Sequence, residues 1–321
     1  YGISEDDPDV REGLVWLLNQ QQEDGSITTG SYPVYDTSLA ILALVATGNR
    51  KAYYNVIREA AQYLIGVQND EGEGYEEGNN FYGGWGYPRE NWADLSNTQF
   101  ALLALHYAEA FNPDDHIVPE SVWEKASIFL QRCQNDDGGF SYQPGGASYG
   151  SMTAAGLWGL YTCKFGAYTP EVSKAWNWFE SHYYIDQNYP RGTWVYYYYI
   201  YSFAKACMLW GKEEIQGHDW YLEMSEVLAN RQADDGHWPG TDPDEEPDLV
   251  ATCWALLALE TKPITTKETT LRVTVDSPVD LHLYDAKGRH VGFNYEKGEV
   301  EIEIPGATYS GPDTEPQVIT V

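Results

Sequence analysis

The sequence Gln-Asn-Asp-Asp-Gly-Gly-Phe at residues 134–140 recurs along the chain in variant form. Residues 22–26 read Gln-Glu-Asp-Gly-Ser, residues 68–72 read Gln-Asn-Asp-Glu-Gly, and residues 232–238 read Gln-Ala-Asp-Asp-Gly-His-Trp. Adjacent acidic residues and glycine favour a tight turn. Self-similarity at intervals of a few tens of residues is typical of proteins built from repeated supersecondary units. The chain is therefore predicted to be a repeat protein.

Each turn separates two kinds of apolar segment. The segment before it has one apolar face, as shown by Val122, Ala126, Phe129 and Leu130, which fit one side of a helix. The segment after it is apolar on all sides, and a helix of that kind has to be buried all round. Pairs of such helices predict an outer layer facing water and an inner layer facing a core. The all-round apolar runs are residues 36–44, 94–105, 150–160 and 248–259.

One further unit fits the repeat more loosely. Residues 170–185 predict an outer helix, and Gly192-Thr193-Trp194 takes the place of the turn. The tyrosine-rich run that follows Trp194 has the composition of a strand. Its place in the repeat favours an inner helix instead. The sequence thus predicts five helix pairs between residues 8 and 262, with a sixth pair before Tyr1 left open.

The pattern changes after residue 262. Residues 271–275, 279–284 and 300–304 alternate apolar and polar side chains with period two, and turn-forming residues separate them. These residues predict a small antiparallel β-sandwich module. Two domains are expected, at residues 1–262 and 263–321, joined by the polar stretch 263–270. We also expect the protein to continue beyond Val321.

The charge balance restricts the possible partners. The 321 residues include 19 Lys and Arg against 49 Asp and Glu, which gives a formal net charge of −30. Such a chain repels phosphate backbones and anionic lipid, so nucleic acid and membrane surfaces are excluded as expected partners.

No apolar run reaches the roughly 20 residues that span a bilayer. The chain starts at Tyr1 without a methionine, and we expect a processed or excised protein whose export signal has been removed.

Four cysteines are spread along the chain without a C-x-x-C pair. Their spacing leaves disulfide pairing open, and we favour free apolar thiols on helices. The acidic composition favours an extracellular or cell-surface protein, or one from a high-salt medium.

The repeated turn, Gln-x-x-Asp-Gly-x-Trp/Phe followed by Asp-Thr-x-x-x-Leu-x-x-Leu, resembles the repeat of the squalene cyclase and protein prenyltransferase superfamily. The resemblance covers roughly residues 8–262. Residues 83–87, 94–100 and 150–157 resemble an uncharacterised prokaryotic branch of that superfamily. The resemblance implies a mainly α protein, an α/α toroid, to which the β module is appended. A shared fold does not by itself transfer a function.

The zinc chemistry of prenyltransferases is not expected here. The resemblance implies a zinc-binding His three residues after Asp248, where this chain has Ala251. It also implies Asp-x-Cys at the start of an inner helix, where Asp36 is followed by Ser38. Catalytic zinc needs three protein ligands and an open position. With two of those ligands replaced, we expect no zinc site.

The acid motif of class II terpene cyclases is also incomplete. The resemblance implies Asp-x-Asp-Asp with a proton-donating middle acid, and Pro247 stands at that position before Asp248. The windows at residues 33–36 and 91–94 fail in the same way. Asp36, Asp94 and Asp248 remain as candidate catalytic acids, or as carboxylates that cap helices. The loop from Asp242 is a solvated acidic loop, a weak calcium site or a source of a catalytic acid. Its candidate calcium ligands are Asp242, Asp244 and Glu245.

Aromatic residues suggest where a ligand would bind. The chain has 12 Trp, 26 Tyr and 9 Phe, and many lie in loops or at the starts of predicted inner helices. In a toroid these positions line one end of a central funnel. Their rings would stack on sugars, hold a hydrophobic chain or stabilise a cation, or simply fill a wide core. The candidate ligand-binding residues are Tyr35, Tyr82, Trp85, Tyr87, Arg89, Trp92, Asn97, Gln99, Tyr149, Trp194 and Tyr196.

Two function classes follow from the sequence. The first is an exported or cell-surface protein whose toroid is a non-catalytic recognition or structural module. Its partner would be a hydrophobic or carbohydrate small molecule, or another surface protein. The second is an enzyme that uses the same funnel, either a divergent terpenoid cyclase or a carbohydrate-active enzyme. No cofactor is expected for either, apart from the calcium alternative.

Overall fold

Each repeated turn joins an outer helix with one buried stripe to an inner helix. The three middle inner helices are buried on most sides, whereas the first and the last are buried on one side only. On the last inner helix just Ala251, Ala255 and Ala258 are buried, so the prediction of burial all round is wrong there. On α5 (Glu120–Cys133) the buried residues follow one face, whereas on α4 (Leu95–Phe111) every residue from Leu95 to Leu105 is buried. The computed structural model describes residues 5–88, 91–261, 272–275, 282–284, 289–295, 297–304, 307–311 and 317–320. In these ranges ten α-helices form five outer–inner pairs. The other outer helices are α1 (Pro8–Leu18), α3 (Arg50–Gly66), α7 (Pro170–Ser181) and α9 (Trp220–Arg231), and the other inner helices are α2 (Pro33–Ala46), α6 (Gly150–Thr162), α8 (Tyr196–Trp210) and α10 (Asp248–Glu260).

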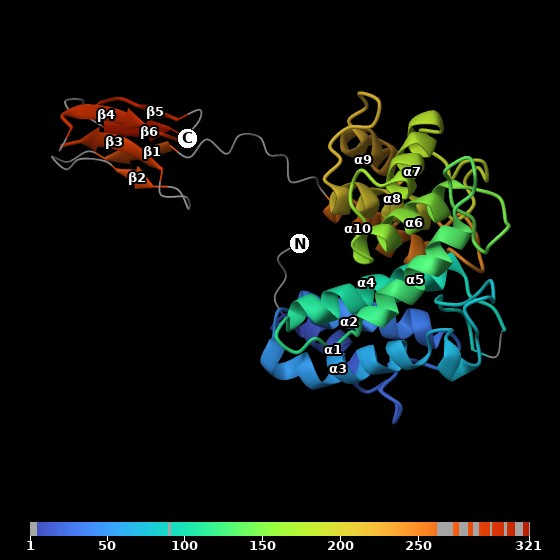
Figure 1. Cartoon of the computed structure of the whole chain (residues 1–321). Coiled ribbons are helices and arrows are strands. Elements are labelled where there is room, and N and C mark those ends of the chain that lie inside the picture. Colours follow the sequence, from blue (N-terminus) through green and yellow to red (C-terminus); the bar gives the residue numbers. More distant parts are fainter. Residues whose placement is uncertain are drawn as a thin grey trace. The chain divides into compact units, whose positions relative to one another are not determined.

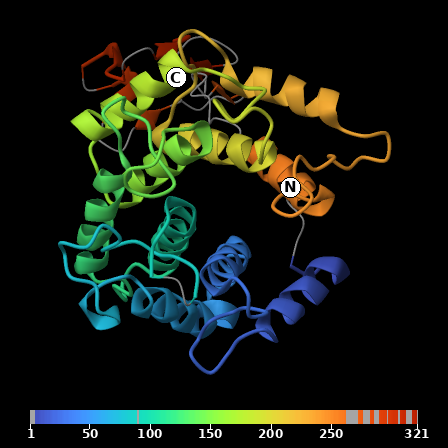
Figure 2. The same ribbon diagram turned by 90° about the vertical axis from the view of Figure 1, so that its right-hand side faces the viewer.

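The inner helices pack in chain order around the centre of the first unit, Tyr1–Pro263. α2 packs on α4, α4 on α6, α6 on α8, and α8 on α10. Figures 1 and 2 show these helices from two directions; the inner series begins at α2 and ends at α10. The architecture is the predicted α/α toroid. The tyrosine-rich run after Trp194 forms α8. The prediction of an inner helix there is confirmed, although the composition of the run favours a strand.

One hydrogen bond recurs in four of the five repeats and fixes the turn to the inner helix. The backbone N–H at the end of each turn donates to a threonine Oγ1 in the first turn or two of the inner helix. The distance is 3.0 Å in each case. The pairs are Ile27 with Thr37, Trp85 with Thr98, Phe140 with Thr153, and Trp238 with Thr252.

The glycines of the turns allow the next outer helix to approach closely. Gly138 has φ of 89°, and a Cβ built on it would lie 2.4 Å from the Lys174 carbonyl oxygen of α7. The turn also bonds to the same helix, because Gln134 Nε2 donates to the Glu171 carbonyl at 2.8 Å. The third turn is therefore tied both to its own inner helix, α6, and to the next outer helix, α7.

The second unit, Ile264–Val321, contains two three-stranded antiparallel sheets. Val291 and Ile319 come from different sheets but share one buried cluster with Ile304 and Ala307. Stacked sheets in a sandwich make contacts of this kind; the sandwich arrangement itself stays a prediction. The strand orders are β1-β6-β5 and β2-β3-β4, with β1 Arg272–Val275, β2 Leu283–Tyr284, β3 His290–Asn294, β4 Glu299–Ile302, β5 Thr308–Tyr309 and β6 Gln317–Thr320.

The cysteines lie in the toroid unit as free thiols. Cys133 and Cys207 are buried, and burial raises the pKa of both. Within the described ranges, no helix is both long and apolar enough to cross a bilayer.

Candidate functional site

Polar side chains from three inner helices meet at the ends where α2, α4 and α8 begin. The Tyr35 hydroxyl of α2 bonds to Ser96 Oγ of α4, and Ser96 Oγ lies 2.6 Å from the Tyr198 hydroxyl of α8. Gln99 Nε2 also donates to that hydroxyl. The network joins segments about 60 and 100 residues apart in sequence. It sets the mutual position of three helices at one end of the toroid.

Asp94 caps α4 beside this network. Its Oδ1 accepts the Asn97 backbone N–H at 2.7 Å, and its Oδ2 accepts the Asn97 side-chain amide at 2.8 Å. Asp94 is fully buried. Burial raises the pKa of Asp94 to about 7, although hydrogen bonds from Asn97 and Tyr142 lower it. Desolvation thus outweighs the hydrogen bonds, and the carboxyl changes its protonation state near neutral pH.

A series of aromatic rings lies next to Asp94, and we call it the aromatic rim: Tyr32, Tyr35, Tyr87, Trp92 and Tyr142. Tyr32 meets Tyr87, Tyr87 meets Trp92, and Trp92 meets Tyr142 edge to face, with centroid distances of 5.7, 5.9 and 6.2 Å. Tyr35 stacks on Tyr87 at 6.4 Å. Tyr32 is 57% exposed and the other four rings are half-buried. The rim therefore offers aromatic surface to solvent beside a buried carboxyl.

Further aromatic rings fill the space between the inner helices. Phe100 of α4 contacts Trp158 of α6 at 5.6 Å and Trp254 of α10 at 5.7 Å. Trp254 stacks on Tyr201 of α8 at 5.1 Å. These rings pack on one another, which corresponds to the core-filling alternative. The half-exposed rim continues into these packed rings, because Tyr35 of the rim lies 5.1 Å from Phe100.

Two amide oxygens near the rim are buried without a partner among the described residues. They are Asn97 Oδ1 and Gln99 Oε1. Both side chains use their amide nitrogens, toward Asp94 and Tyr198 respectively. A buried acceptor that makes no hydrogen bond costs about 1–3 kcal/mol. Both acceptors are enclosed by protein, behind the half-exposed rings of the rim.

The structure brings together five of the predicted site residues: Tyr35, Tyr87, Trp92, Asn97 and Gln99. Of these five, Asn97 bonds directly to the predicted acid Asp94. Arg89, another predicted member, lies outside the described residues.

Three other predicted residues are parts of the framework. Trp85 is fully buried, and its indole N–H donates to the Leu64 carbonyl at 2.7 Å. Tyr196 is also buried, and its hydroxyl donates to the Ile185 carbonyl at 2.9 Å. The Tyr82 hydroxyl donates to Glu71 at 2.9 Å in the loop after α3. Their rings pack within the helical framework, so the structure does not bring them to the rim.

Tyr149 and Trp194 form a separate pair. Their ring centroids are 6.4 Å apart, and the Arg191 guanidinium lies 4.0 and 4.9 Å from them. The cation lies over the Tyr149 ring face, where its attraction to the aromatic quadrupole is favourable. Arg191 already occupies the surface of this pair.

The other two predicted acids are also bound within the fold. Asp36 Oδ2 accepts the Thr28 hydroxyl at 2.7 Å. Asp248 is exposed, and its Oδ1 accepts the Gly240 N–H at 2.8 Å. Neither lies with Asp94, so the three acids do not form one centre.

The proposed calcium ligands do not converge. Asp242 Oδ1 accepts the backbone N–H groups of Asp244 and Glu245 at 3.0 and 2.9 Å, which closes a turn. In the described part of the chain no group of three His, Cys, Asp or Glu residues has the arrangement of a metal site.

The residues at the family's zinc positions do not fit that metal. Ser38 uses its hydroxyl to donate to the Val34 carbonyl at 2.6 Å, and Ala251 is buried without a ligand atom.

The sequence analysis did not identify a buried carboxylate that accepts a backbone hydrogen bond in the first turn of α8. Glu246 is 1% exposed, and its Oε1 accepts the Tyr198 backbone N–H at 2.7 Å. The other oxygen accepts the Thr241 hydroxyl. Burial raises the pKa of Glu246. Its partner on α8 lies 48 residues earlier, so only the three-dimensional fold distinguishes Glu246 from the exposed acids around it.

Comparisons with known proteins agree with this architecture. Residues 3–186, more than half of the chain, match the family described as "Prenyltransferase alpha-alpha toroid domain". No curated protein matches the chain. A solved protein geranylgeranyltransferase-I from Candida albicans, in complex with GGPP, is similar with 17% identity and a TM-score of 0.55. The alignment covers 79% of this chain and 77% of that one. A solved protein from Actinoplanes has 17% identity and a TM-score of 0.52, over 79% of this chain and 74% of that one.

Proposed function

The chain belongs to the prenyltransferase alpha-alpha toroid family, and on that premise we propose that its toroid is a non-catalytic recognition module of an exported or cell-surface protein. In this proposal the aromatic rim binds a small molecule with hydrophobic or carbohydrate faces. The β unit serves as a spacer. The formal net charge of −30 supports an extracellular setting, because a strong net charge keeps a protein soluble and discourages contact with anionic cell components.

The hydrogen bonding of Asp94 carries the non-catalytic proposal. Both of its oxygens accept hydrogen bonds from Asn97, at 2.7 and 2.8 Å, as those of a helix cap do. A general acid instead has to direct a proton at its substrate within hydrogen-bond reach. Asp36 and Asp248 likewise bond to neighbouring turns. Each acid at the start of an inner helix thus has a structural task.

The composition of the rim supports a small-molecule ligand. Half-buried rings such as Tyr87 and Trp92 lose little conformational entropy when a ligand covers them, because neighbouring rings already restrain them. Their faces favour apolar chains and the C–H faces of sugars. A diphosphate requires a cluster of cationic side chains. The described residues that form the rim include no such cluster.

A second function, proton-initiated cyclisation of an isoprenoid, has one observation in its favour. Burial raises the pKa of Asp94 to about 7, so part of the carboxyl is protonated at neutral pH. A carboxylic acid held neutral in an apolar site can supply a proton. For this function Asp94 has to break one of its two hydrogen bonds to Asn97, so that the freed oxygen can face the substrate.

One experiment separates the two functions. The protein is titrated with a panel of isoprenoid alcohols and oligosaccharides, and each ligand is then recovered and examined by mass spectrometry. We expect saturable binding of at least one class, a tenfold or greater loss of affinity in Trp92→Ala, and recovery of every ligand unchanged. Trp16→Ala is the matched control, since Trp16 is 54% exposed on α1, outside the rim.

Turnover by the parent protein that disappears in a folded Asp94→Asn variant would overturn the non-catalytic proposal in favour of cyclisation. Absence of binding to the whole panel, or equal loss in the Trp92 and Trp16 variants, would remove the rim as the binding site.

A further inference from the structure

The last inner helix, α10, exposes an apolar stripe. Leu249 is 76% exposed and Leu256 is 38% exposed, and the exposed Cys253 lies between them. These residues recur at intervals of four and three, which places them on one side of the helix. The buried residues of α10 are three alanines on another side. A contiguous exposed apolar patch on a protein is typical of an interaction site.

The repeated threonine bond gives the inner helices a common register. Thr153 of α6 and Thr252 of α10 accept the same hydrogen bond from their turns, at 3.0 Å. Leu249 and Leu256 lie three residues before and four residues after Thr252. The stripe of α10 can therefore be compared, position by position, with the corresponding residues of α6.

In α6 those positions pack against the next inner helix, α8. A Cβ built on Gly150, three residues before Thr153, would lie 2.7 Å from the Tyr199 ring of α8. The carbonyl of Leu157, four residues after Thr153, accepts the indole N–H of Trp210 of α8 at 2.9 Å. The exposed stripe of α10 is therefore the surface by which an inner helix contacts the inner helix that follows it.

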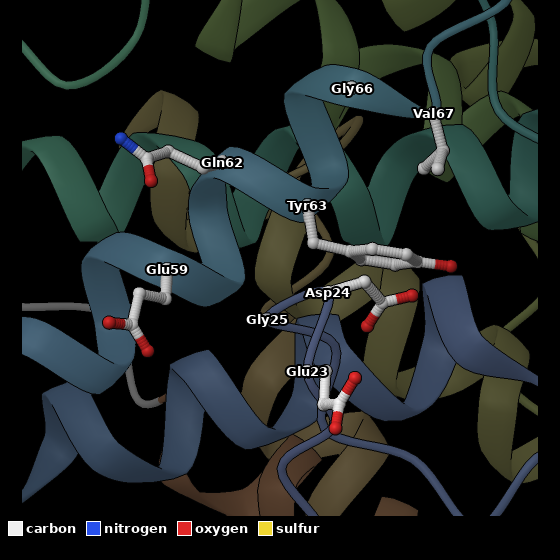
Figure 3. Close-up of a pocket in the computed structure, with 8 residues that line it drawn as sticks. All are labelled: Glu23, Asp24, Gly25, Glu59, Gln62, Tyr63, Gly66 and Val67. Atoms are coloured by element: carbon white, nitrogen blue, oxygen red, sulfur yellow. The ribbon is translucent and has the colours of Figure 1, made fainter.

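The turn before α10 also has a surface that is covered in earlier repeats. Figure 3 shows the first turn beside α3, the outer helix of the second repeat. A Cβ on Gly25 of this turn would lie 2.6 Å from the Glu59 carbonyl oxygen of α3, and one on Gly83 would lie 1.9 Å from the Lys125 carbonyl oxygen of α5. A Cβ on Gly236, the turn glycine before α10, would meet no atom of the described residues within 4 Å. The last repeat thus leaves open the places of both a following outer helix and a following inner helix.

The first outer helix, α1, exposes the complementary surface. Gly13 lies nine residues before the turn glutamine Gln22, as Glu59 of α3 lies nine residues before Gln68. Glu59 receives the preceding turn, whereas Gly13 is exposed. Trp16, further along α1, is 54% exposed. The side of α1 that corresponds to the turn-binding side of α3 is therefore open to solvent.

The first inner helix, α2, likewise exposes the face toward a preceding inner helix. Two residues after the repeated threonine, Phe100 of α4 lies 5.1 Å from Tyr35 of α2, and Trp254 of α10 lies 5.1 Å from Tyr201 of α8. The residue at this position of α2 is Leu39, which is 37% exposed. Each chain therefore has the two halves of one repeat-to-repeat contact, one on its last repeat and one on its first.

The two halves do not join within one chain. α2 packs on α4 and α10 packs on α8, but α2 and α10 do not form such a pair in the part of the chain that the structure describes. In repeat proteins, terminal repeats with polar outer faces keep the single chain soluble. Both terminal repeats here expose apolar residues instead, among them Leu249 and Trp16.

We propose that the last repeat of one copy binds the first repeat of another copy, so that chains associate head to tail. The second copy's α1 and α2 take the places that the next outer and inner helices take elsewhere in the toroid. A contact between two different surfaces closes into a ring or extends as a filament, depending on the rotation between copies. Each copy has a formal net charge of −30, so salt strengthens the association by screening the repulsion. The contact is independent of the aromatic rim.

Sedimentation velocity of the whole chain, over a hundredfold range of concentration at low and high salt, measures the association. We expect the mass to rise with concentration and the association to tighten at least tenfold at high salt. In associated protein, Cys253 should react with a maleimide at least tenfold more slowly than in dilute protein, because the second copy covers it. Protection of Cys253 in a protein that stays monomeric would show that the chain itself covers the stripe. That result, or a parent that stays monomeric with Cys253 reactive, would overturn the proposal.

Two substitutions block one half of the contact each, Leu249→Glu on the last repeat and Leu39→Glu on the first. Each variant alone should be monomeric, with an unfolding temperature within a few degrees of the parent's. An equimolar mixture should form dimers, because the intact last repeat of one variant binds the intact first repeat of the other. Trp16→Glu, at a more exposed position, blocks the first repeat if Leu39→Glu is destabilised.

Leu222→Glu is the matched control, since Leu222 is 55% exposed on α9 and the change in charge is the same. This variant should associate as the parent does. Equal weakening by Leu222→Glu and Leu249→Glu, or a mixture of two folded variants that stays monomeric, would refute head-to-tail association. Association that is lost in Leu249→Glu but kept in both first-repeat variants would show instead that two α10 helices pair with each other.

Discussion

At the scale of single residues, Asp94 combines a structural task with an unusual protonation state. Its hydrogen bonds to Asn97 fix the start of α4 and favour the charged form. Full burial favours the neutral form and has the larger effect, which raises the pKa of Asp94 to about 7. A cap that is neutral in mild acid and charged in mild base makes the stability of the toroid depend on pH.

We predict that Asp94→Asn removes this dependence. Between its ordinary pKa and about 7, Asp94 keeps its proton in the folded state but loses it in the unfolded chain. Raising the pH across this interval therefore costs the folded parent up to about 1.4 kcal/mol per pH unit. Stability from this group is complete in acid and lost as the pH rises through 7. Urea unfolding from about pH 5 to pH 8 should show the parent losing stability relative to the variant.

The Asn variant should still fold, because asparagine caps helices about as well as aspartate. Asn97 can also turn its unpaired Oδ1 toward the new amide. A difference between the two proteins that stays constant from acid to base would contradict the raised pKa.

The sequence indicated the position of this site but not its contacts. Asp94, Asn97 and Gln99 follow one another at the start of an apolar run, so their place in the toroid could be predicted. Their partners Tyr198 and Tyr142 come from other repeats, and single-sequence patterns carry no signal for such pairings. The same limit explains Trp85, whose loop position suggested a ligand-binding ring but whose indole bonds to α3.

At the scale of elements, the repeat made the helices predictable where composition was misleading. Four consecutive tyrosines favour a strand locally, yet α8 is helical because both neighbouring inner helices, α6 and α10, pack on it. Local propensity is weak compared with the burial of a whole helix. The Thr–backbone bond was not predicted, since it depends on how closely the turn approaches the helix.

We predict that this recurrent bond contributes measurably to stability. Thr153→Val keeps the side-chain volume but leaves the buried Phe140 N–H without its acceptor, which should cost about 1–3 kcal/mol of the free energy of unfolding. Thr153→Ser keeps the hydroxyl and should cost less. Thr252→Val should cost less than Thr153→Val, because Thr252 is half-buried whereas Thr153 is fully buried. Urea denaturation monitored by tryptophan fluorescence measures all three variants.

Equal losses for Val and Ser at position 153 would show that the hydroxyl is irrelevant. A larger loss at Thr252 than at Thr153 would contradict the dependence on burial.

At the scale of the whole molecule, each unit has a buried cluster of its own. The toroid cluster draws on all ten helices, and the cluster of the β unit consists of Val291, Ile304, Ala307 and Ile319. A unit that buries its own apolar residues can fold alone when that burial is extensive enough. The toroid meets this condition well, because its cluster extends through all ten described helices.

We therefore predict that protease cuts first between residues 262 and 270, where the sequence is polar and the division into units falls. The fragment of residues 1–262 should keep a helical far-ultraviolet spectrum and melt in one cooperative transition, because the helix pairs and their turn contacts lie within it. A matched chain that ends at residue 231 lacks α10, the inner partner of α8. It should melt at a lower temperature, since removing that helix exposes apolar surface. Loss of helical signal when the chain is cut at 262–270, or equal melting of the two fragments, would refute an independently folding toroid.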